Sequence, residues 1–246
     1  MKQFDTIRIL GIQFFNGHAK EVVNLLKRGG LLVVPAAPAL ITIKKDIPYY
    51  QSLLAADVVI PDSGYMALIW NLFYKQKINR ISGLKFLTAF FEDKEVQKAR
   101  ILLVNPDQQE TEINFTFLRS RGFIPSQITS YPAPLYDKKI VEDKELLKII
   151  EDKRPGYILI SVGGGIQEKL GAYLKKHLSY TPAIICTGAA IAFLTGQQAK
   201  IPDWGDKFFL GWLFRCFENP KLYIPRYFKA FNLITFMLHY GGNAPS

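Results

Sequence analysis

Short apolar runs bounded by turn residues alternate with segments of helical periodicity along most of the chain. This order is typical of a sheet of mostly parallel strands, because parallel neighbours need a long crossover connection that is usually a helix. The predicted strands cover residues 7–12, 31–35, 58–61, 101–105, 128–131, 157–162 and 183–187. The predicted helices cover residues 18–28, 64–74, 83–91, 109–121, 140–153, 166–177 and 189–195. The sequence therefore predicts an α/β domain with a mostly parallel sheet flanked by helices.

Residues 197–246 differ in character from residues 1–196, because no further strand-like run appears and aromatic residues alternate with basic ones. Between residues 207 and 229 there are five Lys or Arg residues and one acid, Glu218, so the net charge there is five minus one, or +4. We expect a catalytic-type domain over 1–196 and a basic, aromatic, helical C-terminal appendage over 197–246 that contacts a membrane or an acceptor. A buried pair of aromatic helices, or a contact between copies of the chain in a homo-oligomer, is the alternative for this appendage.

The formal net charge of +10 favours an anionic partner, which can be nucleic acid, a phosphorylated small molecule or an acidic membrane surface. No recognised nucleic-acid-binding motif accompanies the charge, so we expect no nucleic acid partner. Two cysteines are too few for a disulfide framework, and the three histidines form no metal-binding pair. We find no secretory signal and no apolar run of the roughly 20 residues that cross a bilayer. These features predict a cytoplasmic protein that holds no metal.

Two loops after predicted strands carry charged groups at the edge of the sheet where ligands collect. Asp62 follows one strand and precedes a helix, so its carboxylate can act as a base on a hydroxyl nucleophile. Asp62 can equally be the N-cap of that helix, and the pattern alone favours the cap. Arg80 lies just before Ser82 and Gly83 at the start of another helix, where a guanidinium and free helix N–H groups can bind phosphate. A solvated surface arginine is an equal alternative.

Two further loops are rich in small residues. Gly163, Gly164 and Gly165 lead into Gln167 and Glu168, so the backbone there can approach a ligand closely and a helix N-terminus can face an anion. Residues 186–190 form a second turn of this kind around Gly188. Tight packing of helix on sheet explains either turn as well. Neither matches the dinucleotide-binding fingerprint, and the sequence contains neither a P-loop nor a nucleophile elbow.

Taken in order, these segments resemble the WecG/TagA/CpsF glycosyltransferase family, glycosyltransferase family 26. Single motifs are common, but their order and spacing are specific and cover nearly the whole chain. The matching segments are residues 9–12, 61–64, 80–83, 167–168, 187–196, 200–204, 212–215 and 225–227.

The resemblance implies a Rossmann-like core with a C-terminal appendage that contacts the membrane. It implies an inverting, metal-independent transferase without a cofactor, acting in the synthesis of bacterial cell-surface polysaccharides such as teichoic acid or capsule. Such an enzyme moves an N-acetylmannosamine-type sugar, or its uronic acid, from UDP to a polyprenyl-diphosphate-linked glycan. The protein is then expected to be peripheral on the inner face of the cell membrane.

The family's functional positions are carried over residue by residue. Asp62 matches the aspartate proposed as general base on the acceptor hydroxyl. Arg80 and Gln167 match positions expected near the nucleotide sugar or its diphosphate, and Arg215 matches a basic position of the appendage. The predicted substrate-binding residues are, in chain order, Arg80, Gly83, Gly163, Gln167, Glu168, Gly188 and Arg215.

This chain departs from the family pattern at several positions. Pro35, Ala36 and Ala37 stand where the family usually has Thr-x-Asn, and Lys85 replaces an acid. Loss of hydrogen-bonding groups from a sugar pocket weakens recognition of that sugar. The departures favour, as an alternative function, a catalytically silent protein that binds nucleotide sugars or acts as a scaffold in a polysaccharide assembly complex.

Overall fold

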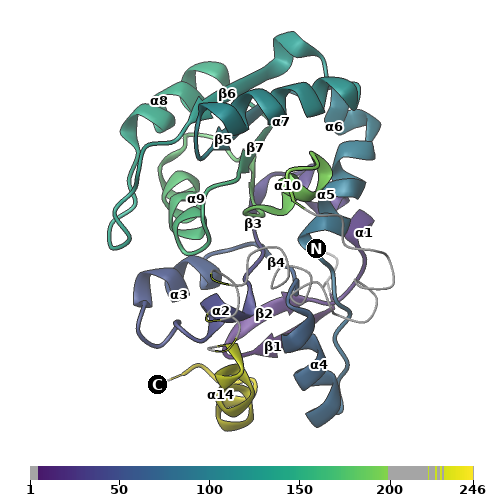
Figure 1. Ribbon diagram of the computed structural model, residues 1–246, viewed down its shortest axis with the longest axis vertical. Helices are drawn as coiled ribbons and strands as arrows, with labels where there is room; N and C mark the ends of the chain where they lie inside the picture. Colours follow the sequence, from purple (N-terminus) through teal and green to yellow (C-terminus); the bar gives the residue numbers. More distant parts are fainter. Residues whose placement is uncertain (1–4, 199–220, 222–224, 226–227, 229, 246) are drawn as a thin grey trace.

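The computed structural model describes residues 5–198, 221, 225, 228 and 230–245, and its sheet follows the order β1-β2-β4-β3-β8-β7-β5-β6 (Figure 1). Every neighbouring pair is parallel except β1 and β2. The strands are β1 (Thr6–Ile9), β2 (Ile12–Phe15), β3 (Gly30–Val33), β4 (Val58–Val59), β5 (Ile101–Asn105), β6 (Ile128–Pro132), β7 (Tyr157–Ile160) and β8 (Ala183–Cys186). The predicted α/β fold with a mostly parallel sheet is confirmed.

One strand prediction is wrong. Residues 7–12 do not form a single strand, because the chain reverses at Leu10 and Gly11, whose φ angles are 53° and 80°. β1 and β2 pair antiparallel across this turn, with Ile9 opposite Ile12. The apolar run continues through the turn because Leu10 is itself buried, so the sequence carries no polar break at the reversal.

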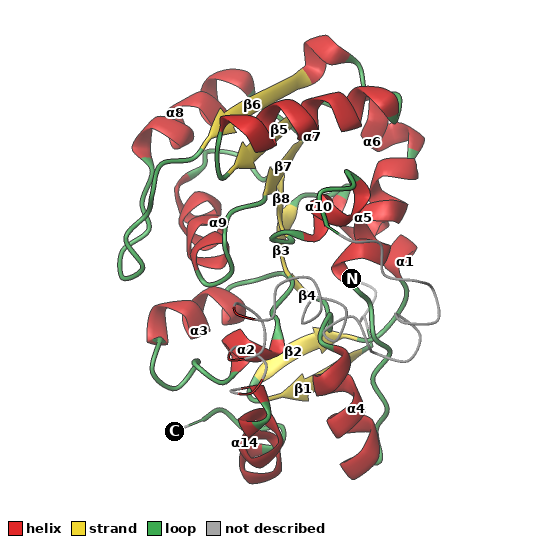
Figure 2. Cartoon of the chain, in the orientation of Figure 1, coloured by secondary structure: helices red, strands yellow, loops and turns green. Residues whose placement is uncertain are grey.

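Helices cover both faces of the sheet (Figure 2). On one face lie α1 (Ala19–Leu26), α5 (Gly83–Glu92), α6 (Lys94–Lys98), α7 (Gln108–Ser120) and α10 (Ala190–Leu194). On the other lie α2 (Ala37–Leu40), α3 (Ile47–Leu54), α4 (Gly64–Phe73), α8 (Lys144–Lys153), α9 (Ile166–His177) and α14 (Asn232–Tyr240). A short 3-10 helix, η1, spans Pro125–Gln127.

The boundaries of these helices follow from capping groups. α8 begins at Lys144, four residues later than predicted, because the Asp143 carboxylate accepts a hydrogen bond from Leu146 N at 2.8 Å. The short helices α2 and α6 and the longer α3 were not predicted. α3 also starts at an aspartate cap, since Asp46 accepts from Tyr49 N at 3.1 Å.

The central strands are buried on both faces, so alternate residues supply two separate apolar layers. Leu31 and Val33 of β3 point into the layer under α9, whereas Leu32 belongs to the layer under α5. Burial of each such side chain is worth about 1.5–3 kcal/mol relative to exposure. These layers fix the strands rigidly and leave the loops at their carboxyl ends to carry ligands.

The described C-terminal residues lie against the main body of the protein beside α4 (Figure 1). Leu233 and Met237 of α14 are fully buried in the same apolar layer as α4. Residues after α14 also meet the β1–β2 turn, because Leu10 N donates to Gly241 O at 2.8 Å. The division of the chain at residue 197 stays a prediction, and most of the predicted basic aromatic segment, residues 199–220 included, lies outside the described residues. Within the described part of the chain, every helix is too short or too polar to span a bilayer.

Candidate active site

The candidate site lies at the carboxyl edge of four neighbouring strands, β4, β3, β8 and β7. Because parallel strands end at the same edge, the loops after β4, β8 and β7 come together there. Asp62 follows β4, Gly188 follows β8, and Gly163 follows β7. The start of α5 at Gly83 completes this edge.

Asp62 does not cap the helix that follows it. Ser63 fills that position, since its hydroxyl accepts a hydrogen bond from Met66 N at 3.1 Å. The Asp62 carboxylate instead accepts through Oδ1 from Gly83 N at 2.9 Å. Asp62 is half-buried, and its Oδ2 accepts no hydrogen bond from the residues that the structure describes. This leaves one carboxylate oxygen for a proton from a ligand.

Arg80 is attached to the same loop, because its Nε donates to the Asp62 carbonyl oxygen at 2.7 Å. Two N–H groups at the start of α5, beside Arg80, already donate hydrogen bonds within the protein. The sequence had predicted free N–H groups there that could bind phosphate. Gly83 N donates to Asp62, and Lys85 N donates to the Ser82 hydroxyl at 3.1 Å. The guanidinium of Arg80, held next to Asp62, is the cationic group of this loop.

Gly83 brings α5 close to α10. A Cβ atom at Gly83 would lie 3.2 Å from the Ala190 Cβ and 3.6 Å from the Val34 Cγ1. A side chain there would push the two helix starts apart, which explains why glycine suits this position. The contact places the Asp62 loop beside the loop after β8.

Gln167 and Glu168 join the loops after β7 and β8. Gln167 Oε1 accepts from Gly188 N at 2.7 Å, and its Nε2 donates to Glu168 Oε1 at 3.1 Å. Glu168 Oε2 accepts from Gly165 N at 2.6 Å, at the start of α9. Glu168 is 1% exposed, and burial raises the pKa of its carboxyl. Both side chains therefore hold backbone loops in place.

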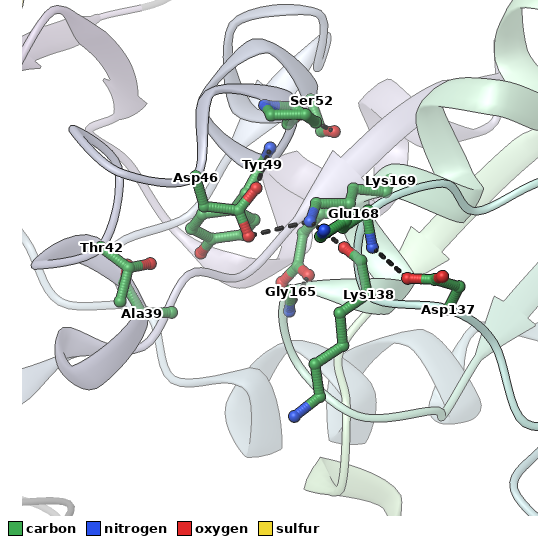
Figure 3. Close-up of polar contacts among 12 residues, drawn as sticks. Ala39, Thr42, Asp46, Tyr49, Ser52, Asp137, Lys138, Gly165, Glu168 and Lys169 are labelled. Atoms are coloured by element: carbon green, nitrogen blue, oxygen red, sulfur yellow. Dashed lines mark hydrogen bonds and ion pairs between the residues drawn. The ribbon is translucent and has the colours of Figure 1, made fainter.

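A buried polar group behind Glu168 was missed from the sequence (Figure 3). Lys169 Nζ contacts Asp46 Oδ2 at 2.8 Å and donates to the Lys138 carbonyl at 2.6 Å. Tyr49 is 1% exposed, and among the described residues its hydroxyl has no hydrogen-bond partner. Burial raises the pKa of this hydroxyl well above its usual value. Asp46 just before Ile47-Pro48 is the one signal, since it marks a helix start.

The glycine run after β7 leaves open space at this edge. A Cβ atom at Gly163, Gly164 or Gly165 would meet nothing within 4 Å. Gly163 and Gly164 are exposed, and Gly165 has a φ of 89°. The backbone here can therefore approach a ligand without displacing side chains.

The structure thus brings Asp62, Arg80 and Gly83 into one group and Gln167, Glu168 and Gly188 into a second, adjacent one. Arg215 lies outside the described residues. No group of three or more His, Cys, Asp or Glu residues suited to a metal ion occurs in residues 5–198 or in the other described positions. Substrate binding by these side chains stays a prediction, while their convergence at one edge is observed.

Comparison with known proteins identifies the family. Residues 7–243 match the Glycosyl transferase WecG/TagA/CpsF family. A curated protein of Bacillus spizizenii (strain ATCC 23059 / NRRL B-14472 / W23) is 22% identical over 218 residues, which are 85% of this chain and 82% of that protein. Its counterpart of Bacillus subtilis (strain 168) is 23% identical over 192 residues, 74% of this chain and 71% of that protein.

Both relatives carry the name N-acetylglucosaminyldiphosphoundecaprenol N-acetyl-beta-D-mannosaminyltransferase. The family match extends from β1 to the residues after α14, so it includes every loop of the candidate site. The chain therefore belongs to the WecG/TagA/CpsF family and is a glycosyltransferase.

Proposed function

We propose that this protein transfers an N-acetylmannosamine-type sugar from UDP to a polyprenyl-diphosphate-linked glycan during synthesis of a bacterial cell-surface polysaccharide. The names of the two relatives support the sugar and the lipid-linked acceptor. The observation that carries the proposal is the state of Asp62, a half-buried carboxylate with one oxygen held by Gly83 N and the other without a hydrogen-bond donor among the described residues. It lies where the loops after β4, β8 and β7 meet.

In the proposed reaction, Asp62 acts as the general base on the acceptor. Oδ2 takes the proton of the acceptor hydroxyl as its oxygen attacks the anomeric carbon of the donor sugar. The bond between that carbon and the diphosphate oxygen breaks, and the electron pair leaves with UDP. Because the attack comes from the face opposite the leaving group, the configuration at the anomeric carbon inverts.

Charge on the departing diphosphate is stabilised by groups of the chain, without a metal. Arg80 supplies a cation beside Asp62, fixed by its Nε hydrogen bond to the Asp62 carbonyl. The glycine loop before α9 gives the diphosphate access to backbone N–H groups. Gln167 and Glu168 serve by holding Gly188 and Gly165 in position, because their side chains hydrogen-bond to the backbone N–H groups of those two residues and to each other.

A transfer assay tests this proposal. The full chain is incubated with radiolabelled UDP-N-acetylmannosamine and polyprenyl-diphosphate-linked N-acetylglucosamine, with and without EDTA. We expect transfer in both samples and an inverted anomeric configuration by NMR of the product. UDP binding without turnover over a broad panel of donors would instead favour the silent binder or scaffold, which the apolar Pro35 and Ala37 motivate. Transfer that EDTA abolishes would overturn the metal-independent mechanism.

We also propose that the protein binds peripherally to the inner face of the cell membrane, where such an acceptor resides. Apolar side chains of α4 and of the residues before α14 are exposed: Leu72 by 71%, Phe228 by 75% and Phe231 by 53%. Tyr65 of α4 contacts Phe231 with ring centroids 5.6 Å apart, so these residues form one surface. Aromatic side chains favour the interfacial region of a bilayer.

Sedimentation with anionic vesicles tests this surface. Phe228→Glu removes an exposed ring and is expected to lower the bound fraction. Leu135→Glu is the matched control, because Leu135 is fully exposed but follows β6, at the opposite edge of the sheet. Equal binding by both variants would contradict the assignment. A lower molecular mass of Phe228→Glu in solution with unchanged vesicle binding would identify the surface as a contact between copies of the chain.

A further inference from the structure

Lys169 is a buried cation near the start of α9 that the proposed reaction does not use (Figure 3). Its side chain is 7% exposed, and its Nζ contacts Asp46 Oδ2 at 2.8 Å and donates to the Lys138 carbonyl oxygen at 2.6 Å. Lysine is almost never buried to this extent unless it is paired. The two oxygens belong to two different segments, so one ammonium group joins three parts of the chain.

The contact with Asp46 joins α9 to α3. Asp46 Oδ1 accepts from Tyr49 N at 3.1 Å and caps α3, and Oδ2 of the same carboxylate accepts from Lys169. Tyr49 is itself buried in the apolar layer under α9. The start of one helix is therefore held to the start of the other by a directed, charge-assisted contact.

The contact with Lys138 joins α9 to the connection between β6 and α8, residues 133–143. β5 lies between β6 and β7 in the sheet, so this connection extends past the end of β5 to meet a helix that follows β7. Every side chain from residue 134 to residue 140 is exposed except Tyr136, which is half-buried. Side-chain packing therefore does little to place this part of the connection, and its carbonyl contact with Lys169 is the tie to α9.

The glycine loop, residues 163–165, depends on where α9 begins. A Cβ atom at any of its three positions would meet none of the described atoms within 4 Å, so side-chain packing does not hold the loop. Two of its hydrogen bonds run into α9. Gly165 N donates to Glu168 Oε2 at 2.6 Å, and Gly163 O accepts from Ile166 N at 3.2 Å. A displacement of the start of α9 would therefore move the glycine loop with it.

We propose that Lys169 is a positioning residue for the donor diphosphate, because its contacts with Asp46 and Lys138 determine where the glycine loop lies. This inference rests on the proposed function, in which that loop gives the diphosphate access to backbone N–H groups. Lys169 acts through Glu168 and the loop, not by contact with substrate. Replacement of a buried ion pair by apolar groups is often neutral for stability, whereas misplacement of a binding group by about 1 Å can cost about 10²-fold in rate.

Calorimetry on the full chain with UDP, and with uridine measured by displacement of UDP, tests the proposal because uridine lacks the diphosphate. Lys169→Met keeps an unbranched side chain and removes the charge. We expect UDP binding to weaken by roughly 10-fold, the ratio for one lost hydrogen bond, with the uridine affinity unchanged. Lys169→Arg can still donate to both oxygens and should keep most of the UDP affinity. A role in folding alone would instead lower the melting temperature and reduce binding of both ligands to the same extent.

Asp46→Asn breaks the same contact from its more exposed side, since the Asp46 side chain is 36% exposed. The asparagine oxygen can still accept from Tyr49 N, so the cap of α3 is kept, while an amide NH₂ faces the ammonium group. We expect the same selective loss of UDP affinity, which keeps the proposal testable if Lys169→Met folds poorly.

Lys175→Met is the matched control. Lys175 is on the same helix and makes the same two kinds of contact, with Asp57 Oδ2 at 2.7 Å and with the Ala55 carbonyl oxygen at 2.8 Å. These contacts lie at the opposite edge of the sheet, because Asp57 directly precedes β4. The ratio of UDP to uridine affinity should stay unchanged in this variant.

An unchanged ratio in Lys169→Met and Asp46→Asn as well would overturn the positioning role and leave the transferase proposal intact. Failure of the unmodified chain to bind UDP would overturn the proposed function, and the positioning role with it.

Discussion

Asp62 follows β4 and Glu168 follows β7, two parallel strands that are separated by β3 and β8 and end at the same edge of the sheet. Each acid accepts a hydrogen bond from a backbone N–H at a helix start. Glu168 is 1% exposed, and both of its oxygens accept hydrogen bonds. Asp62 is half-buried and has one oxygen engaged. Both acids therefore lie at the carboxyl edge of the sheet, but Glu168 holds loops in place, whereas Asp62 can exchange a proton with a ligand.

The packing of the two helices produces this difference. α9 lies so close to the sheet that a Cβ atom at Gly171 would be 2.7 Å from Leu31 Cδ1 and 2.8 Å from Cys186 Sγ. Glu168, one turn before Gly171, is sealed by that approach. Asp62 instead lies in the loop between β4 and α4, and its carboxylate reaches sideways to the start of α5. A glycine inside a helix thus determines how much of a nearby acid solvent can reach.

The largest expected effect is on turnover, from Asp62→Asn. Asparagine keeps an oxygen for the Gly83 N–H but puts an amide where Oδ2 was, and an amide cannot take the acceptor proton. We expect kcat to fall by roughly 10²–10⁴-fold, the range for loss of a general base. UDP affinity and the melting temperature should change little, because the loop keeps its hydrogen bond. Transfer assays, calorimetry and thermal unfolding check the three expectations.

Asp152→Asn is the control for that variant, because Asp152 is an exposed carboxylate on α8. It should retain normal turnover. Normal turnover by Asp62→Asn as well would show that Asp62 is not the base. Asp62 and Glu168 would then differ in burial and hydrogen bonding but not in catalytic role. A large drop in melting temperature for Asp62→Asn would instead make Asp62 a structural residue like Glu168.

The sequence was sufficient to predict the α/β architecture, the family and the loops that meet at the site, because parallel strands place all their carboxyl ends at one edge. It was not sufficient to assign the partners within those loops. Asp62 and Ser63 are both good cap residues, and only the fold shows that Ser63 caps α4 while Asp62 reaches Gly83, 21 positions away. Tertiary contacts of this kind leave no local pattern.

The same reason explains the other omissions. Lys169 and Asp46 are 123 positions apart, so their ion pair could not be anticipated from spacing. The buried side-chain oxygens of Ser161 and Thr187 have no hydrogen-bond partner in the part of the chain that the structure describes, and the sequence shows these residues only as small ones after apolar strands. Short helices such as α2 and α6 are too brief to produce a helical period, and the turn at Leu10 and Gly11 interrupts no apolar pattern.

The smaller expected effect concerns the pH dependence of stability and is due to Glu168. Burial raises the pKa of this carboxyl above its ordinary value of 4.5 in the folded protein. The folded state therefore holds the proton to higher pH than the unfolded state. The resulting stabilisation is complete below pH 4.5 and is lost as the pH rises through the folded pKa. Each unit by which the pKa is raised corresponds to about 1.4 kcal/mol.

Glu168→Gln measures this contribution, because glutamine resembles the protonated acid and still offers Oε1 to Gly165 N. We expect the melting temperature of the variant to exceed that of the unmodified protein increasingly as the pH is raised from acid to neutral. Tyr49 and Cys186, which face Glu168, have pKa values raised well above 10.0 and 9.0 and stay neutral in this range, so they do not mask the trend. Glu112→Gln is the control, since Glu112 is exposed on α7 and its removal should leave the pH profile parallel to the original. A parallel profile for Glu168→Gln too would mean that solvent reaches Glu168, and the contrast with Asp62 would then have to rest on hydrogen bonding alone.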